Sequence, residues 1–223
     1  MGSVIVAFSG GIDSSLVLKL AHDELGAQAV GITAVSPTLP ASELDATQKI
    51  AAEIGARHRI VETDQLQIPE FVLNDATRCY HCKTDLYSLL ETLRSEYADG
   101  YIVDGTNVDD LGDDRPGLKA ARERGVRSPL LEAGFSKADI RDVARELHLS
   151  NWDKPAAACL SSRIPRGITI TRSTLSRVER AEDALAQEGF RQYRVRDHGE
   201  IARIELAVEE LLGLLQPGRR ERL

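Results

Sequence analysis

The sequence predicts an α/β protein with a doubly wound parallel sheet and a second, smaller α+β domain. Short apolar runs rich in β-branched residues alternate with amphipathic stretches in the first two thirds of the chain. This alternation is typical of βαβ units with right-handed crossovers. After Pro155 a loop with prolines and a glycine is followed by a shorter helical and strand pattern. We therefore expect one domain over residues 1–157 and another over residues 158–223.

Four strands are expected in the first domain, over residues 4–8, 29–35, 58–61 and 101–103. Apolar residues at helical spacing follow the first two strands, from Leu16 to Leu25 and from Ile50 to Ile54. In the second domain a capped, charged helix is expected over residues 171–187, because Thr171 suits the position before a first turn. Two strands over 192–196 and 201–206 and a last helix near 208–215 complete the prediction.

Composition excludes several classes of protein. The 223 residues have a formal net charge of −7 and only 4% aromatic residues, which argues against broad contact with a nucleic-acid backbone or stacked bases. No apolar run reaches the roughly 18 residues that a membrane span requires. An odd number of cysteines, three, argues against a disulfide framework. We expect a cytoplasmic protein with reduced thiols.

A glycine loop follows the first strand and opens the first helix. It reads Ser9-Gly10-Gly11-Ile12-Asp13-Ser14-Ser15. Glycines let backbone N–H groups turn toward a ligand, and a helix N-terminus has a partial positive charge, so this arrangement suits a phosphate. The loop lacks the Gly-Lys-Ser/Thr of a Walker A motif and the spaced glycines of dinucleotide-binding folds. The alternative is a plain turn in which Asp13 or Ser14 caps the helix.

The three cysteines form two motifs. Cys79 and Cys82 flank Tyr80-His81, and Cys159 lies far downstream in the loop after Pro155. They could be packing residues, a redox dithiol with a separate thiol, or a zinc site that includes His81. They could also hold a [4Fe–4S] cluster, in which three thiolates leave one of the four irons open.

The glycine loop resembles the pyrophosphate loop, or PP-loop, of the ATP pyrophosphatase superfamily, whose domains have an adenine nucleotide alpha hydrolase-like fold. In that superfamily the loop holds the β- and γ-phosphates of ATP while an acceptor oxygen attacks the α-phosphate. The resemblance implies phosphate contacts from Ser9, Gly10, Gly11, Asp13, Ser14 and Ser15. It implies an adenine site near Ser36 and Gly105, at the ends of two strands.

An ordered set of further motifs resembles the LarE family, the ATP-dependent sulfur transferases of nickel-pincer cofactor synthesis. The resemblance covers nearly the whole chain. Besides the glycine loop, it rests on Asp104-Gly105-Thr106-Asn107, Asp114-Arg115-Pro116-Gly117-Leu118-Lys119-Ala120, Leu149-Ser150-Asn151-Trp152-Asp153-Lys154-Pro155, Ser161-Ser162-Arg163-Ile164-Pro165, Val195-Arg196-Asp197-His198 and Ile201-Ala202-Arg203-Ile204-Glu205.

The resemblance implies that ATP and Mg²⁺ activate a carboxylate of pyridinium-3,5-biscarboxylic acid mononucleotide, which becomes a thiocarboxylate. Some members of the family sacrifice one cysteine, and others hold an iron–sulfur cluster on three. The pattern of this chain implies the second type, with Cys79, Cys82 and Cys159 as metal ligands of a [4Fe–4S] cluster. In the first type Cys159 alone would be needed.

Further roles are also implied by the resemblance. Cys159, Asp13, Arg163 and Glu182 are the implied catalytic residues, and Ser162, Arg163, Arg194 and Arg196 the implied substrate-binding residues. Arg194 and Arg196 are two apart on a predicted strand, so their side chains lie on the same face. Two guanidinium groups on one face suit a phosphate. The alternative is that this face of the strand is simply charged and exposed to solvent. An acidic loop could hold Mg²⁺ or be solvated; its residues are Asp109, Asp110, Asp113 and Asp114.

Two rival functions remain open: a PP-loop tRNA thiolase, and a non-catalytic module that binds ATP or AMP. The expected partners are a small nucleotide substrate and, by the resemblance, copies of the chain itself in a hexamer or trimer of dimers. No nucleic-acid or membrane partner is expected, and the sulfur donor is not predicted. Relatives in the family continue past the last helix, so the second domain is expected to be incomplete.

Overall fold

A parallel sheet forms the centre of the computed structural model, which describes residues 1–112, 116–216 and 218. Its strands are β1 (Val4–Ala7), β2 (Ala29–Val35), β3 (Arg57–Glu62) and β4 (Tyr101–Val103), in the order β3-β2-β1-β4. The predicted α/β class is confirmed, and each strand lies within a residue or so of its predicted range. The chain moves outward from β1 to β3 and then returns to the other side of β1 with β4. Such a reversal opens a crevice at the carboxyl ends of the strands.

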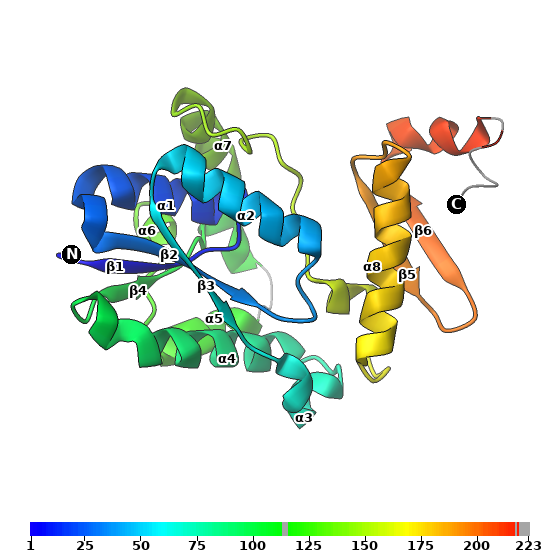
Figure 1. The fold of residues 1–223 in the computed structure, drawn as a ribbon, viewed down its shortest axis with the longest axis horizontal. Coiled ribbons are helices and arrows are strands. Elements are labelled where there is room, and N and C mark those ends of the chain that lie inside the picture. Colours follow the sequence, from blue (N-terminus) through cyan, green and yellow to red (C-terminus); the bar gives the residue numbers. More distant parts are fainter. Residues whose placement is uncertain (113–115, 217, 219–223) are drawn as a thin grey trace.

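Helices cover both faces of this sheet (Figure 1). On one face lie α1 (Ile12–Leu25), α2 (Ala41–Ile54), α6 (Pro129–Glu132) and α7 (Lys137–Glu146), and on the other lie α4 (Arg78–Leu93) and α5 (Pro116–Glu123). Alternate strand residues enter the two cores: Val6 packs with α1, and Ile5 packs with α4. The sheet is therefore buried on both faces, as its apolar strands require.

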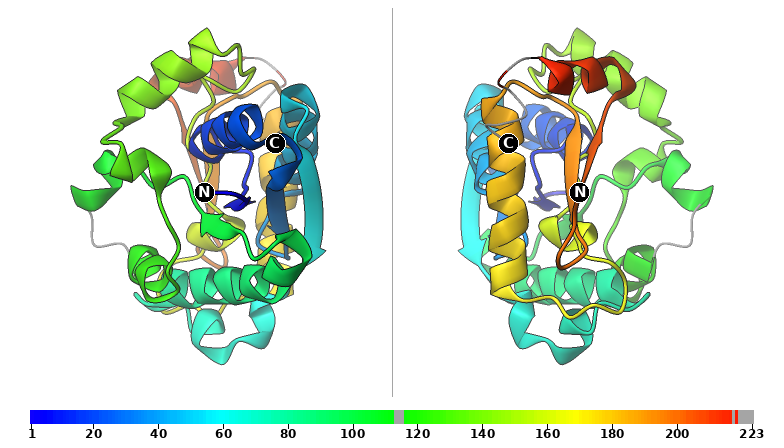
Figure 2. Two further views of the ribbon diagram at one scale, coloured as in Figure 1. Left: turned by 90° about the vertical axis from the view of Figure 1, so that its left-hand side faces the viewer. Right: turned by 90° about the vertical axis from the view of Figure 1, so that its right-hand side faces the viewer.

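The C-terminal part packs a helix against a two-stranded antiparallel hairpin. Helix α8 (Arg172–Gln187) begins after a capping box between Thr171 and Thr174 and lies alongside β5 (Tyr193–Asp197) and β6 (Ala202–Leu206), as Figure 2 shows. The predicted last helix is instead a 3-10 helix, Val208–Leu215. The prediction of a smaller α+β unit is thus confirmed.

One apolar cluster joins the two parts of the chain. Phe71 of the short helix α3 (Pro69–Val72) packs with Leu160 and with Leu175 of α8. The boundary between residues 157 and 158 stays a prediction, because this cluster extends across it. Among the described residues, no helix combines the length and the apolar content needed to cross a membrane.

Candidate functional site

The glycine loop turns directly from β1 into α1. Ser9 and Ser14 are joined across the turn: the Ser9 N–H donates to Ser14 Oγ at 3.2 Å, and the Ser14 hydroxyl donates to the Gly11 carbonyl at 3.1 Å. No side chain caps the first turn of α1. The alternative in which Asp13 or Ser14 is only a helix cap therefore has no support in the hydrogen bonds. An uncapped N-terminus facing a cavity suits an anion.

Two glycines are required by close contacts at this turn. Gly10 has φ +69°, and a Cβ there would lie 2.8 Å from Thr47 Cγ2 of α2. At Gly105, which follows β4, a Cβ would lie 2.7 Å from the Ser14 backbone nitrogen. The carboxyl end of β4 thus lies directly against the first turn of α1.

Asp13 has a cationic partner that the sequence did not indicate. Lys137, at the start of α7, donates from Nζ to both carboxylate oxygens of Asp13 at 2.6 Å. Asn107 donates to the same carboxylate at 3.3 Å. This pair places an ammonium group beside the predicted phosphate site.

Ser15 differs from its neighbours in the loop. Its side chain is fully buried, and its hydroxyl accepts a hydrogen bond from Asn151 at 2.9 Å. The Asn151 amide also donates to the Gly10 carbonyl at 3.0 Å. Ser15 and Asn151 therefore hold the loop in place through buried hydrogen bonds. Because the Ser15 side chain is buried, a phosphate contact from this residue would have to come from its backbone N–H.

The loop and all three cysteines line one cavity of about 690 Å³ at the carboxyl edge of the sheet. Its lining includes most of the predicted nucleotide residues and all of the predicted thiols: Ser9, Asp13, Ser14, Ser36, Gly105, Cys79, Cys82 and Cys159. The segments that meet here are far apart in sequence but come together at the switch point of the sheet.

The loop with Cys159 is held to the helices that precede and include the other two thiols. Buried Asn74, between α3 and α4, donates to the carbonyls of Pro165 at 2.8 Å and Ile168 at 3.0 Å. Arg78, next to Cys79, donates to the Ser161 carbonyl at 2.9 Å. The position of Cys159 relative to Cys79 is thereby set by hydrogen bonds as well as by chain connectivity.

The thiols differ in their surroundings. Cys79 is exposed, whereas Cys82 and Cys159 are partly buried. Burial, together with negative charge on Cys159 and Cys79, raises the pKa of Cys82 to about 12. Among the described residues no three His, Cys, Asp or Glu side chains converge closely enough to hold one metal ion. The zinc alternative therefore gains no support.

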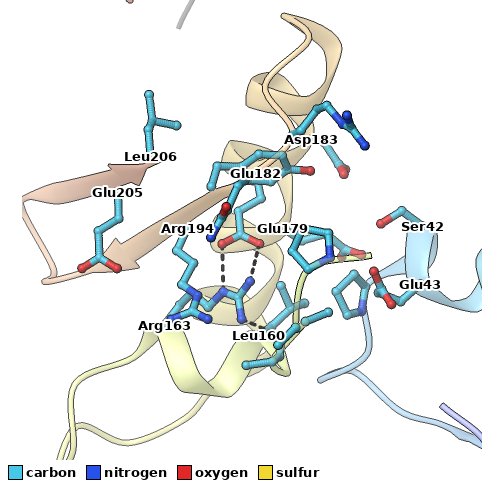
Figure 3. Close-up of a pocket in the computed structure, with 18 of the residues that line it drawn as sticks. Ser42, Glu43, Leu160, Arg163, Glu179, Glu182, Asp183, Arg194, Glu205 and Leu206 are labelled. Atoms are coloured by element: carbon cyan, nitrogen blue, oxygen red, sulfur yellow. Dashed lines mark hydrogen bonds and ion pairs between the residues drawn. The ribbon is translucent and has the colours of Figure 1, made fainter. Parts of the chain in front are cut away.

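A second groove lies on the other side of the Cys159 loop, between α2, α8 and the hairpin (Figure 3). Arg163 and Glu182 form a buried ion pair there, with Nε to Oε1 at 2.8 Å and Nη2 to Oε2 at 3.1 Å. Arg163 also donates to the Ala158 carbonyl at 2.6 Å and the Cys159 carbonyl at 3.2 Å. These contacts give Arg163 and Glu182 a positioning role on the Cys159 loop, and their catalytic roles stay predictions.

The two predicted phosphate-binding arginines are not equivalent. Arg194 lines the second groove, and no hydrogen bond or ion pair joins its guanidinium to any described residue. Arg196 donates to Glu205 at 2.7 Å and to the Ser162 carbonyl at 3.3 Å. Its hydrogen bond lowers the pKa of Glu205 to about 2, so the pair stays charged. Arg194 is the arginine that is available to a ligand.

Two carboxylates of the acidic loop already accept hydrogen bonds from backbone N–H groups. Asp109 accepts from the Lys137 N–H at 2.7 Å, and Asp110 accepts from the Asn107 N–H at 3.0 Å while lining the nucleotide cavity. Asp113 and Asp114 lie outside the described residues.

Two basic residues that the sequence analysis did not single out, Lys83 and Arg166, also line the nucleotide cavity. Lys83 follows Cys82, and Arg166 follows the Ser161–Pro165 motif.

Comparisons with known proteins agree with this geometry. Residues 2–90, which include the glycine loop, match the asparagine synthase family. The chain is 43% identical over 204 residues to the pyridinium-3,5-bisthiocarboxylic acid mononucleotide synthase of Lactiplantibacillus plantarum, covering 91% of this chain and 74% of that protein. It is 47% identical to an uncharacterised protein of Synechocystis, and the match covers 95% of this chain and 79% of that protein. It is 32% identical to an uncharacterised protein of Methanocaldococcus jannaschii, and that match covers 91% of this chain and 77% of the relative.

The loop, the crevice and these matches define an ATP-dependent sulfurtransferase with a PP-loop domain. More specifically, the chain belongs to the LarE family.

Proposed function

We propose that this enzyme uses ATP to convert a carboxylate of pyridinium-3,5-biscarboxylic acid mononucleotide into a thiocarboxylate. The observation that supports this most directly is the single cavity lined by both the PP-loop and three thiols. An ATP-binding module without catalysis would not need thiols beside the nucleotide. A tRNA thiolase would need a basic surface that a chain of net charge −7 does not suit.

In the first step a carboxylate oxygen of the substrate bonds to the α-phosphorus of ATP, and the bond from that phosphorus to the bridging oxygen of pyrophosphate breaks. The N-terminus of α1 would face the phosphates, and Lys137, paired with Asp13 on the cavity wall, would add positive charge near the leaving group. Mg²⁺ would accompany the phosphates, with Asp110 as one candidate ligand on the cavity wall.

In the second step a sulfur nucleophile bonds to the activated acyl carbon, and AMP leaves with the oxygen. Cys79, Cys82 and Cys159 would together hold a [4Fe–4S] cluster, each thiolate on a different iron, so the three need not converge on one ion. When bound, such a cluster supplies an iron with an open position for sulfide. The raised pKa of Cys82 means that this thiol would release a proton as iron binds.

The mononucleotide phosphate would bind in the second groove at Arg194, while Arg196, which donates to Glu205 on the groove wall and to the Ser162 carbonyl, would support the groove from outside its lining. Replacing both arginines by alanine should raise the mononucleotide concentration needed for turnover and leave ATP affinity unchanged. Equal loss of both affinities would contradict this division of the site.

Anaerobic purification followed by iron and sulfide quantification tests the cluster. We expect a brown protein with about four irons per chain. Cys82→Ser should lose that iron, whereas Ser162→Ala, which alters the Cys159 loop without removing a thiol, should retain it. Dehydroalanine at position 159 after turnover, in protein that never contained iron, would show the sacrificial mechanism instead.

We also propose that the enzyme is a homo-oligomer, a hexamer or a trimer of dimers. Several large apolar side chains near the hairpin are exposed, among them Ile201, Val208 and Leu212. Light scattering of the purified protein tests this directly, and a monomer at micromolar concentration would refute it.

A further inference from the structure

We propose that Gln65, held by Asp85, recognises the adenine base of ATP through the 6-amino group. This inference rests on the ATP-dependent step of the proposed function, and it assigns the specificity for the base to a side chain outside the glycine loop. Gln65 follows β3 and lines the nucleotide cavity, together with Ala34 and Ser36 at the end of β2.

The carbonyl oxygen of Gln65 lacks a partner. The residue is only 4% exposed, and its Oε1 atom is buried without a hydrogen bond in the described structure. A buried acceptor in this condition is costly unless a ligand supplies the donor. A residue that both lines a cavity and has an unpaired acceptor is therefore a candidate contact for a bound N–H group.

Asp85 fixes which end of the amide is available. Its Oδ2 accepts from the Thr63 hydroxyl at 2.7 Å and from Gln65 Nε2 at 2.9 Å. If the amide were turned over, its oxygen would face the carboxylate and both groups would be acceptors. The carboxylate thus keeps the NH₂ of Gln65 turned toward α4 and leaves the oxygen as the end of the amide that has no partner.

An acceptor in a fixed orientation discriminates between nucleotides. The 6-amino group of adenine donates a hydrogen bond, whereas inosine has a carbonyl oxygen at the same position. The lining of the same cavity also includes the apolar side chains of Ile32, Leu39 and Leu86, which suit a flat base. A ribose hydroxyl is a weaker candidate, because it would not account for these apolar side chains.

The test is calorimetric titration of the full chain with MgATP and MgITP, which differ at the base alone. We expect wild type to bind MgATP roughly 10- to 100-fold more tightly than MgITP, the usual effect of one buried unpaired group. Gln65→Leu should bring this ratio close to one. Asp85→Asn should lower it as well, because an asparagine lets the Gln65 amide turn and present its NH₂ to the inosine carbonyl.

Gln67→Leu is the matched control, since Gln67 is exposed in the same turn and does not line the cavity. It should keep the wild-type ratio. Thermal melting checks that each variant is folded. If folded Gln65→Leu retains the full preference for MgATP, the inference is overturned while the ATP-dependent step stands. If the wild-type protein binds neither nucleotide, the inference about Gln65 and the proposed ATP-dependent step are both wrong.

Discussion

Replacing Glu182 by alanine should destabilise the protein strongly, because it leaves a buried positive charge without its counter-ion. The side chains of Arg163 and Glu182 are only 7% and 9% exposed. Two of the Arg163 hydrogen bonds go to this carboxylate, which also accepts from the Val195 N–H at 2.9 Å. Breaking one side of a buried pair costs about 3–5 kcal/mol, and we expect the free energy of unfolding to fall by that amount.

Urea denaturation measures this loss. Asp23→Ala is the control, since it breaks the partly exposed pair with Lys19 and should cost less than about 1 kcal/mol. The double variant Arg163→Met with Glu182→Leu should lose less than Glu182→Ala, because no buried charge is left unpaired. A loss in Glu182→Ala no larger than that of the control would refute the reasoning.

Three further predictions concern the loop, its lysine and one histidine. Gly10→Ala should destabilise the fold and weaken ATP binding more than Gly125→Ala, because both positions have positive φ but only Gly10 has a close neighbour; equal effects in denaturation and titration would contradict this. Lys137→Ala should weaken MgATP binding roughly tenfold, since it leaves the Asp13 carboxylate uncompensated beside the phosphates; unchanged affinity would exclude Lys137 from the site. Burial lowers the pKa of His58 below 6.5, so its contribution to stability is present above pH 6.5 and is lost as the pH falls through the lower, folded pKa; His58→Gln should flatten that part of the pH profile of unfolding.

Much of the fold follows from short-range patterns. The strands are predicted well because their residues are apolar, β-branched and bounded by turn residues, as at Ala29–Val35, whose bounds match the prediction. Helix α4 was not predicted, since its sequence from Arg78 to Leu93 mixes polar residues around the thiols and shows a weak apolar stripe. The 3-10 form of the last element was missed for a similar reason, because apolar spacing alone does not distinguish helix types.

The candidate site was predicted in part. The glycine loop and the three cysteines have local signatures, and the crevice at the switch point brings them together as expected. Lys137, Asn74 and Gln65 have no such signature. Their partners are far away in sequence, for example 124 positions between Lys137 and Asp13, so only the folded chain shows what they contact.

Ala157 lines both the nucleotide cavity and the groove on the far side of the Cys159 loop. At this exposed residue the cavity and the groove adjoin. A substrate whose phosphate lies in the groove and whose carboxylate reaches the cavity would therefore cross the Cys159 loop at position 157. A larger side chain there would narrow the crossing, and the two neighbours, Ala156 and Ala158, are equally small.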